Sequence, residues 1–245
     1  MKHGLMMLLM VFTLPAGAAQ ATPDWPTIEA ESLRHFQALL RIDSSHPPGN
    51  ESRVSEYLKQ VLERDGIPVK LYEAEKGRAN LVARLPGSGR KRPLLLMAHT
   101  DVVRADPSRW KFPPFSATRD GGYIYARGAV DDKDNLTAAL MTLLLLKRAG
   151  ITPERDVILL AEAGEETATR VGIEHMVDEH FADIDAEYCI AEGGITLRRD
   201  GRTLYAQVQM AEKRQNTVEL VAKGTSGHGS IPRVDNAVVS LARAI

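Results

Sequence analysis

The 245-residue sequence predicts an α/β fold in which a largely buried sheet carries helices on both of its faces. Three short runs of apolar residues, at residues 93–98, 157–161 and 188–191, are typical of strands covered on both sides. Segments with the helical spacing of apolar residues separate these runs, as in α/β domains. The composition, 44% hydrophobic and 26% charged, is that of a globular chain.

The remaining elements fit between and around these runs. Apolar side chains at helical spacing predict four helices. The first begins near Thr27, which is a suitable N-cap. Gly66 and Gly150 stand where the second and third of these helices should end. The predicted helices are residues 27–40, 51–65, 135–149 and 171–180, and two further strands are predicted at residues 69–72 and 80–85.

The pattern changes after Gly194, which indicates a second module. Alternating polar and apolar residues predict two strands, a Gly/Ser-rich loop follows them, and an apolar segment predicts the start of a helix. The predicted strands are residues 203–210 and 216–222, the loop is 224–232 and the helix is 237–245. We therefore expect a first domain at residues 22–200 and the second at 201–245.

Residues 1–21 are expected to be a secretory signal peptide. Lys2 lies in a short basic start, a Leu- and Met-rich run follows at residues 5–14, and small residues at 16–18 suit signal-peptidase cleavage. The apolar run is too short for a stable membrane anchor, although a tethered N-terminus is the alternative. The mature protein is therefore expected to be secreted or periplasmic.

Charge and cysteine content exclude several classes of function. The chain has 31 basic and 32 acidic residues, so it has no positive excess for a phosphate backbone, and nucleic acid is not an expected partner. Cys189 is the only cysteine, so neither an internal disulfide nor a Cys-rich zinc site is available. Any metal ion must be held by histidine and carboxylates.

Polar residues that can bind metal ions follow all three apolar runs. His99 and Asp101 follow the first, Glu165 and Glu166 follow the second, and Glu192 follows the third. In open α/β sheets, ligands bind beyond the carboxyl ends of the strands. These residues are therefore expected to converge at one edge of the sheet.

A further acidic pair, Asp131 and Asp132, directly precedes a predicted helix. Each residue also has an ordinary interpretation: an aspartate can cap the helix, His99 can be a satisfied buried histidine, and the glutamates can be solvated charges. Clustered carboxylates, however, repel one another and raise one another's pKa, a cost that a divalent cation removes. One imidazole with several carboxylates suits Zn²⁺, or a pair of Zn²⁺, Co²⁺ or Mn²⁺ ions.

Spacing within the clusters suggests how the roles divide. His99 and Asp101 are two residues apart, so in a strand they point the same way, and Asp101 is predicted to accept the second ring N–H of His99. Of the adjacent Glu165 and Glu166, one can bind metal while the other takes a proton from water. The alternative for this pair is two solvated acids outside the site.

In their order along the chain, these motifs resemble the co-catalytic zinc peptidases of the twentieth metallopeptidase family. This family includes aminoacylase, glutamate carboxypeptidase, desuccinylases, acetylornithine deacetylase and carboxypeptidase S. The resemblance implies a three-layer α/β sheet, followed by the start of an inserted α+β lid or dimerisation domain. The motifs are Met97-Ala-His-Thr-Asp101, Ala126-Arg-Gly-Ala-Val-Asp-Asp-Lys133, Ala163-Gly-Glu-Glu166, Glu192-Gly-Gly194 and Gly227-His-Gly-Ser230.

The resemblance implies a metal ligand set for two zinc ions. His99 and Glu192 bind one ion, Glu166 binds the other, and Asp131 bridges both. In the family, the peptide bond that follows the bridging aspartate is commonly cis, so a cis bond is expected between Asp131 and Asp132.

The resemblance also implies catalytic roles. Asp101 orients His99, and Glu165 is the general base and acid. His228 matches a lid histidine that commonly reaches the partner subunit's active site and steadies the developing oxyanion, so a homodimer through the lid is expected. A histidine in a surface loop is the alternative for His228.

The expected function is metal-dependent, carboxypeptidase-like hydrolysis of an amide bond in small peptides or N-acyl amino acids through a zinc-activated water. The alternatives are an N-acyl-amino-acid deacylase or deacetylase of the same family, or an inactive exported remnant that binds metal. Family members usually extend well beyond this length, and a C-terminal histidine ligand and the rest of the lid are missing. We therefore expect a fragment or a truncated product that is inactive alone.

Overall fold

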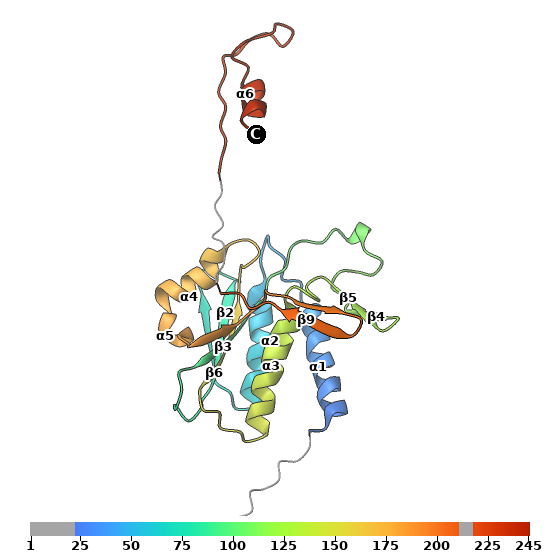
Figure 1. Cartoon of the computed structure of the whole chain (residues 1–245), viewed down its shortest axis with the longest axis vertical. Coiled ribbons are helices and arrows are strands. Elements are labelled where there is room, and N and C mark those ends of the chain that lie inside the picture. The colour runs from blue at the N-terminus through green and yellow to red at the C-terminus, as the bar shows by residue number, and fades with distance from the viewer. Residues whose placement is uncertain (1–22, 211–217) are drawn as a thin grey trace, which may run out of the picture. The chain divides into compact units, whose positions relative to one another are not determined.

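The computed structural model describes residues 23–210 and 218–245. Its residues form two compact units that divide between Glu192 and Gly193, and Figure 1 labels most of the elements. The signal peptide predicted at residues 1–21 lies outside the described residues. Among the helices that the structure describes, none combines the length and the apolar character needed to cross a membrane.

The first unit is built on a mixed sheet with the strand order β1-β2-β6-β3-β7. Strand β3 lies between β6 and β7 and runs parallel to both, whereas β2 is antiparallel to β6 and to β1. The three parallel strands are the three apolar runs of the sequence. The bounds are β1 Val69–Glu73, β2 Ala79–Leu85, β3 Leu94–His99, β6 Val157–Glu162 and β7 Tyr188–Ile190.

One expectation about the sheet is wrong. The third apolar run was expected to be buried, yet the side chains of β7 are exposed, with Tyr188 and Ile190 each 59% accessible. Among the strands that the structure describes, β7 pairs only with β3 and is therefore an edge strand. By contrast, every residue of β6 is buried, since this strand has a neighbour on each side and helices over both faces.

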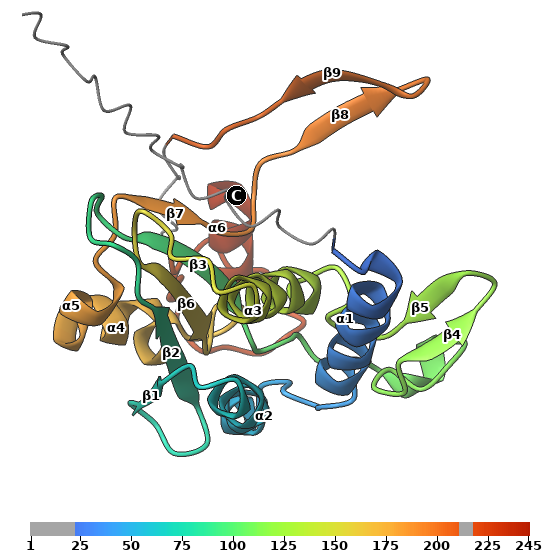
Figure 2. The same cartoon turned by 90° about the horizontal axis from the view of Figure 1, so that it is seen from below.

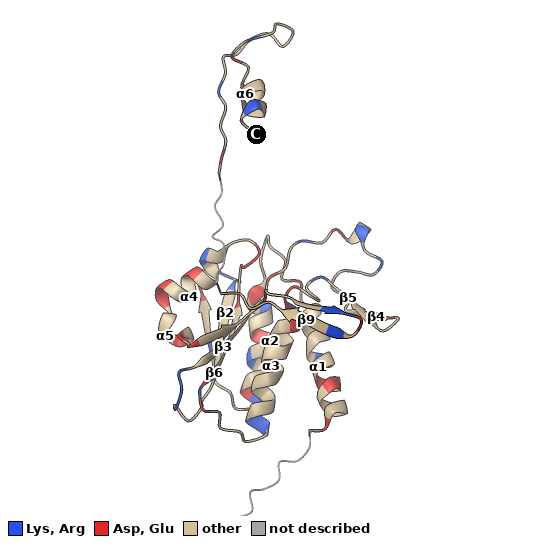
Figure 3. Ribbon diagram, viewed as in Figure 1, with Lys and Arg blue, Asp and Glu red and all other residues tan. Residues whose placement is uncertain are grey.

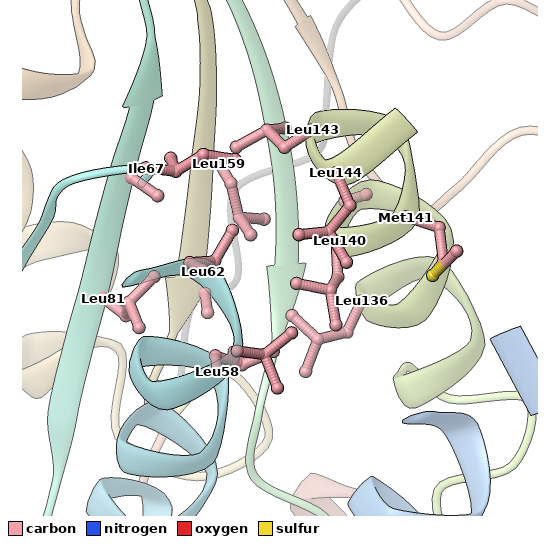
Figure 4. Packing of buried hydrophobic residues seen from close by; sticks show 14 of the residues in the cluster. Leu58, Leu62, Ile67, Leu81, Leu136, Leu140, Met141, Leu143, Leu144 and Leu159 are labelled. Carbon is pink, nitrogen blue, oxygen red and sulfur yellow. The ribbon is translucent and has the colours of Figure 1, made fainter. Parts of the chain in front are cut away.

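Helices cover both faces of the sheet, as the sequence predicts (Figure 2). On one face, α2 (Glu51–Arg64) and α3 (Lys133–Arg148) pack against β2, β3 and β6. Figure 4 shows the leucine-rich core that results, in which Leu62, Leu140 and Leu159 are fully buried. On the other face, α4 (Ile173–Glu179) and α5 (Phe181–Ile184) contribute Met176 and Ile184 to a smaller cluster.

The remaining elements of the first unit lie around this core. Helix α1 (Trp25–Leu40) packs beside α3, and its N-cap is Asp24 rather than the predicted Thr27. The Asp24 carboxylate accepts hydrogen bonds from the backbone N–H and the hydroxyl of Thr27, so an acceptor lies three residues further upstream than expected. Strands β4 (Thr118–Asp120) and β5 (Tyr123–Tyr125) form a hairpin, and short 3₁₀ turns occupy Pro107–Arg109 and Thr169–Val171.

The second unit contains a hairpin of β8 (Thr196–Arg199) and β9 (Arg202–Ala206), together with α6 (Ala237–Ala244). The predicted strand at 203–210 is therefore shorter, and β8 was not predicted. The strand predicted at 216–222 is wrong for residues 218–222, and its first two residues lie outside the described part. Alternation alone does not make a strand, because its backbone groups also need a partner strand.

Replacement of Leu140 tests the leucine core. We expect Leu140→Ala to lower the free energy of unfolding by about 2–5 kcal/mol, because it leaves a cavity between α3 and the sheet. Urea denaturation followed by circular dichroism measures this change. The control is Ile151→Ala, at a side chain that is 39% exposed, which should change stability much less. Equal losses for the two variants would contradict this description of the core.

Candidate active site

The candidate site is centred on His99, the last residue of β3. Its position in the parallel sheet is opposite Glu162, the last residue of β6, so both side chains stand at the same edge. The ring is buried, and its Nε2 lies 2.9 Å from Oδ1 of Asp131 and 3.7 Å from Oε2 of Glu192. The structure therefore brings residues from three separate motifs to one ring nitrogen.

The other ring nitrogen of His99 is held by Asp101, but through its backbone. Nδ1 lies 2.9 Å from the carbonyl oxygen of Asp101, whereas the Asp101 carboxylate is 3.6 Å away. The expectation that the carboxylate makes this contact assumes that the strand alternation continues to residue 101. The strand ends at His99, so this alternation does not apply to the residues after it.

The carboxylate of Asp101 instead organises the loop that follows β6. Its two oxygens accept hydrogen bonds from the backbone N–H groups of Glu165 and Glu166, at 3.1 Å each. Asp101 is fully buried, so these bonds are shielded from water. One side chain therefore fixes the backbone that carries both glutamates.

The acidic pair before α3 is also held in place. The peptide bond between Asp131 and Asp132 is cis, which confirms that expectation. Asp132 is buried, and its carboxylate accepts hydrogen bonds from the backbone N–H of His99 and from the side chain of Asn135. Although Asp132 occupies the N-cap position of α3, its side chain makes no capping hydrogen bond. The helix-cap interpretation therefore fails for this side chain.

Lys133 connects the same segment to the end of α1. Its side chain is buried, and its ammonium group donates hydrogen bonds to the carbonyl oxygens of Leu39 and Ile42 at the end of α1. Burial lowers the pKa of Lys133 to about 8. Gly128 has a φ of +80°, and a Cβ there would lie 2.7 Å from a methyl group of Val102, so the turn needs glycine.

Two further residues support the loop after β6. Glu162 is buried, burial raises its pKa to about 7, and its Oε1 accepts the backbone N–H of Ile173 at 2.9 Å. The Asn80 side chain accepts the N–H of Ala163 and donates to the carbonyl of Val171. The sequence pattern puts Glu162 among the acids at strand ends but indicates no role for it. Asn80 sits within an ordinary strand pattern, which offers no signal of this task.

The side chains at this edge form two overlapping sets of metal-ligand type. His99 lies with Asp132 and Glu192 in one set, and with Asp131 and Glu166 in the other. Within each set, one donor atom of each residue lies within 4.8 Å of the others. All four predicted metal ligands are thus brought together, along with Asp132.

The charge balance of this cluster favours a bound cation. Burial, followed by repulsion from neighbouring carboxylates, raises the pKa of Glu166, Glu192 and the nearby Glu165. Burial also raises the pKa of Asp132. Burial of His99 opposes its charge, but the nearby carboxylates of Asp101 and Asp131 outweigh burial and raise its pKa to about 10. One imidazole among several carboxylates is a donor set that fits divalent Zn²⁺, Co²⁺ or Mn²⁺.

A cavity of about 250 Å³ lies beside these donors. His99, Asp132, Glu162, Glu165 and Glu192 line its polar part, and Met97 and Ile173 line an apolar part. A concave site with a few convergent polar groups is typical of ligand binding.

His228 belongs to the second unit and is exposed in the loop before α6. Its Nδ1 lies 2.8 Å from the hydroxyl oxygen of Ser230 and accepts the backbone N–H of the same residue. These local bonds orient the ring within its loop. The oxyanion role of His228 stays a prediction.

Comparison with known proteins shows that residues 95–243 match peptidase family M20/M25/M40. An uncharacterised carboxypeptidase of Schizosaccharomyces pombe is 36% identical over 84% of this chain and 37% of its own length. A probable succinyl-diaminopimelate desuccinylase of Staphylococcus aureus is 33% identical over 87% of this chain and 50% of its own length. The chain thus spans half or less of the length of these relatives.

Two solved structures resemble this fold. An M20 family metallo-carboxypeptidase from Sulfolobus solfataricus superposes with a TM-score of 0.59 and 31% identity, over 70% of this chain and 39% of its own. A tripeptidase from Staphylococcus aureus gives a TM-score of 0.53 and 27% identity, over 69% of this chain and 44% of its own.

Removal of the shared imidazole tests the metal-ligand assignment. We expect His99→Ala to weaken binding of Zn²⁺ by about tenfold or more, because His99 belongs to both donor sets. Elemental analysis after dialysis against buffered Zn²⁺ measures the metal per chain. His46→Ala, at a histidine outside the cluster, is the control and should retain the metal. Unchanged metal content in His99→Ala would remove His99 from the ligand set.

Proposed function

The chain belongs to peptidase family M20/M25/M40, and on that premise we propose that it supplies the catalytic centre of a metal-dependent amide hydrolase. The proposed reaction is carboxypeptidase-like cleavage of small peptides or of N-acyl amino acids. The observation that carries it is the pair Glu165–Glu166, fixed by Asp101 beside the donor cluster of His99.

The proposed cofactor is a pair of divalent cations, Zn²⁺ first, with Co²⁺ or Mn²⁺ as alternatives. His99 and Glu192 would hold one cation, Glu166 the other, and Asp131 both. When bound, such cations polarise a carbonyl group and lower the pKa of a water molecule. The cluster supports this assignment, because its carboxylates crowd one imidazole and need positive charge nearby.

Glu165 is the proposed general base and acid. Among the described residues, the donor sets include Glu166 and leave out Glu165, although the same aspartate fixes the backbone of both. Glu165 lines the cavity, where its side chain would face a bound substrate. Its carboxylate would take a proton from the attacking water and deliver that proton to the leaving amine nitrogen.

The names of the relatives point to two candidate classes of substrate. The relative from Schizosaccharomyces pombe is named a carboxypeptidase, which favours peptides, and those from staphylococci are named desuccinylases, which favours N-acyl amino acids. Peptides are the first candidate, since that relative has the highest identity of these three. Comparison of kcat/KM on dipeptides and on N-succinyl amino acids distinguishes them.

Three further features of the protein are proposals. His228 would steady the developing oxyanion, the second unit would form a homodimer, and residues 1–21 would direct export. The sequence motifs around His228 and the apolar run at residues 5–14 support them.

Substitution of the general base tests the proposed mechanism. In a form of the protein with measurable turnover, we expect Glu165→Gln to lower kcat by about 10²–10⁴-fold while metal binding is retained. The reason is that the amide keeps the shape of the side chain but cannot accept the proton. Hydrolysis of a dipeptide panel and metal analysis measure the two quantities.

The control for this test is Glu63→Gln, at an exposed glutamate of α2. It should leave both turnover and metal content unchanged. Full activity of Glu165→Gln, or loss of its metal, would refute the role of general base.

Export can be tested on the intact chain. Expressed with its own N-terminus in a bacterium, the protein should appear in the periplasm with a new N-terminus near Thr22, because the signal peptide is removed there. Mass spectrometry of the fractionated protein reads this directly. A cytoplasmic protein that keeps Lys2 would argue against the signal peptide.

A further inference from the structure

A second group of metal-ligand side chains lies on α4 and at its junction with α5, and it shares no residue with the site above. His175 and Glu179 are one turn apart on α4, and His180 is the residue between α4 and α5. One donor atom from each of the three lies within 4.8 Å of the others. We propose that these residues bind a divalent transition metal such as Zn²⁺.

Two of the donors already stand at a spacing that suits a metal ion. Nδ1 of His175 lies 3.4 Å from Oε1 of Glu179. Two ligands of a tetrahedral zinc ion, with bonds of about 2.0–2.1 Å, are separated by about 3.4 Å. The ion therefore fits between these atoms without a change of the helix, and His180 offers a third donor atom within 4.8 Å of both.

Neighbouring groups hold the two imidazoles in a defined arrangement. The rings of His175 and His180 meet edge to face, with centroids 4.9 Å apart, and the His175 side chain is only 10% exposed. On its other side, His180 packs against the ring of Tyr72, with centroids 4.0 Å apart. Tyr72 is fixed in turn because its hydroxyl donates to the carboxylate of Asp183 on α5. Ordered donors lose little conformational freedom on binding a metal.

The charge of this region also favours a cation. Figure 3 shows acidic residues on α4 and α5, and neither helix contains a lysine or an arginine. Besides Glu179, the acids are Glu174, Asp178 and Asp183. Lys70 pairs with Asp183, so part of the negative charge on α5 is balanced. Within residues 23–210 and 218–245, no lysine or arginine pairs with the acids of α4, so a bound cation there would be attracted.

The chemistry of the three donors determines which metal ions this site would bind. Two imidazoles and one carboxylate suit Zn²⁺, Co²⁺, Ni²⁺ or Cu²⁺, whereas Ca²⁺ and Mg²⁺ prefer oxygen ligands alone. Three protein ligands leave a position for water. Because the ligands lie on α4 and just before α5, the bound ion ties the end of one helix to the start of the next. It needs no part in amide hydrolysis, so this inference does not depend on the proposed function.

Calorimetric titration of Zn²⁺ into the chain that carries His99→Ala tests the proposal with the first site weakened. We expect one binding event that is lost when His175→Ala and His180→Ala are added, and weakened by about tenfold or more in Glu179→Gln. With Cu²⁺ in place of Zn²⁺, electron paramagnetic resonance should show coupling to imidazole nitrogen that disappears in the double histidine variant.

The matched control is Glu174→Gln on the same helix, outside the three ligands, which should bind as the parent does. Circular dichroism shows whether the double histidine variant is folded. If it is not, Glu179→Gln decides the outcome, because that exposed side chain can be changed without opening the core. Zn²⁺ binding of unchanged affinity and stoichiometry in Glu179→Gln or in the folded double variant would overturn the proposal.

Discussion

The structure of the first unit depends on one constraint: it must hold several mutually repelling carboxylates close to one buried imidazole. Asp131, Asp132 and Glu192 approach His99 directly, and Glu166 lies with Asp131 in a second set. Such a group would separate if its side chains stood on mobile loops, because each carboxylate raises the cost of charging its neighbour. The fold therefore has to supply rigid backbone at the edge of the sheet, and a bound cation would supply the missing positive charge.

That rigidity comes from buried residues that are not themselves ligands. Asp101 accepts two backbone N–H groups and so fixes both glutamates, and Asn80 joins the two ends of their loop. Lys133 ties the acidic turn to α1 through two backbone carbonyl oxygens. Hydrogen bonds in a buried setting are strong and costly to break, which keeps donors at a fixed spacing. The precision of the site therefore depends on these supporting residues as much as on its ligands.

The sequence predicts the centre of this arrangement better than its periphery. His99, Glu166 and Glu192 each follow an apolar run, and parallel strands end at one edge, so their convergence follows from the pattern. The carbonyl contact of Asp101 could not be predicted, since it depends on where β3 ends. The exposure of β7 could not be predicted either, because it depends on pairing with strands distant along the chain. The missed strand β8 pairs locally with β9, and its short sequence Thr-Leu-Arg-Arg has no clear alternation of apolar residues. Asn80 lies in an ordinary strand, and its contacts exist only in three dimensions.

The candidate metal ligands and the histidine proposed to stabilise the oxyanion lie in different units of the chain. Every side chain of the two donor sets, together with Glu165, lies in the first unit, whereas His228 lies in the second. In the proposed mechanism, the first unit alone would therefore provide both the ligands of the cations and the base beside them. Stabilisation of a developing oxyanion requires a donor aimed at an atom of bound substrate, which a local pair such as His228 with Ser230 does not by itself provide. In the proposed mechanism, the first unit would therefore supply the metal ligands and the general base, whereas the oxyanion donor would have to come from elsewhere, with His228 as its proposed source.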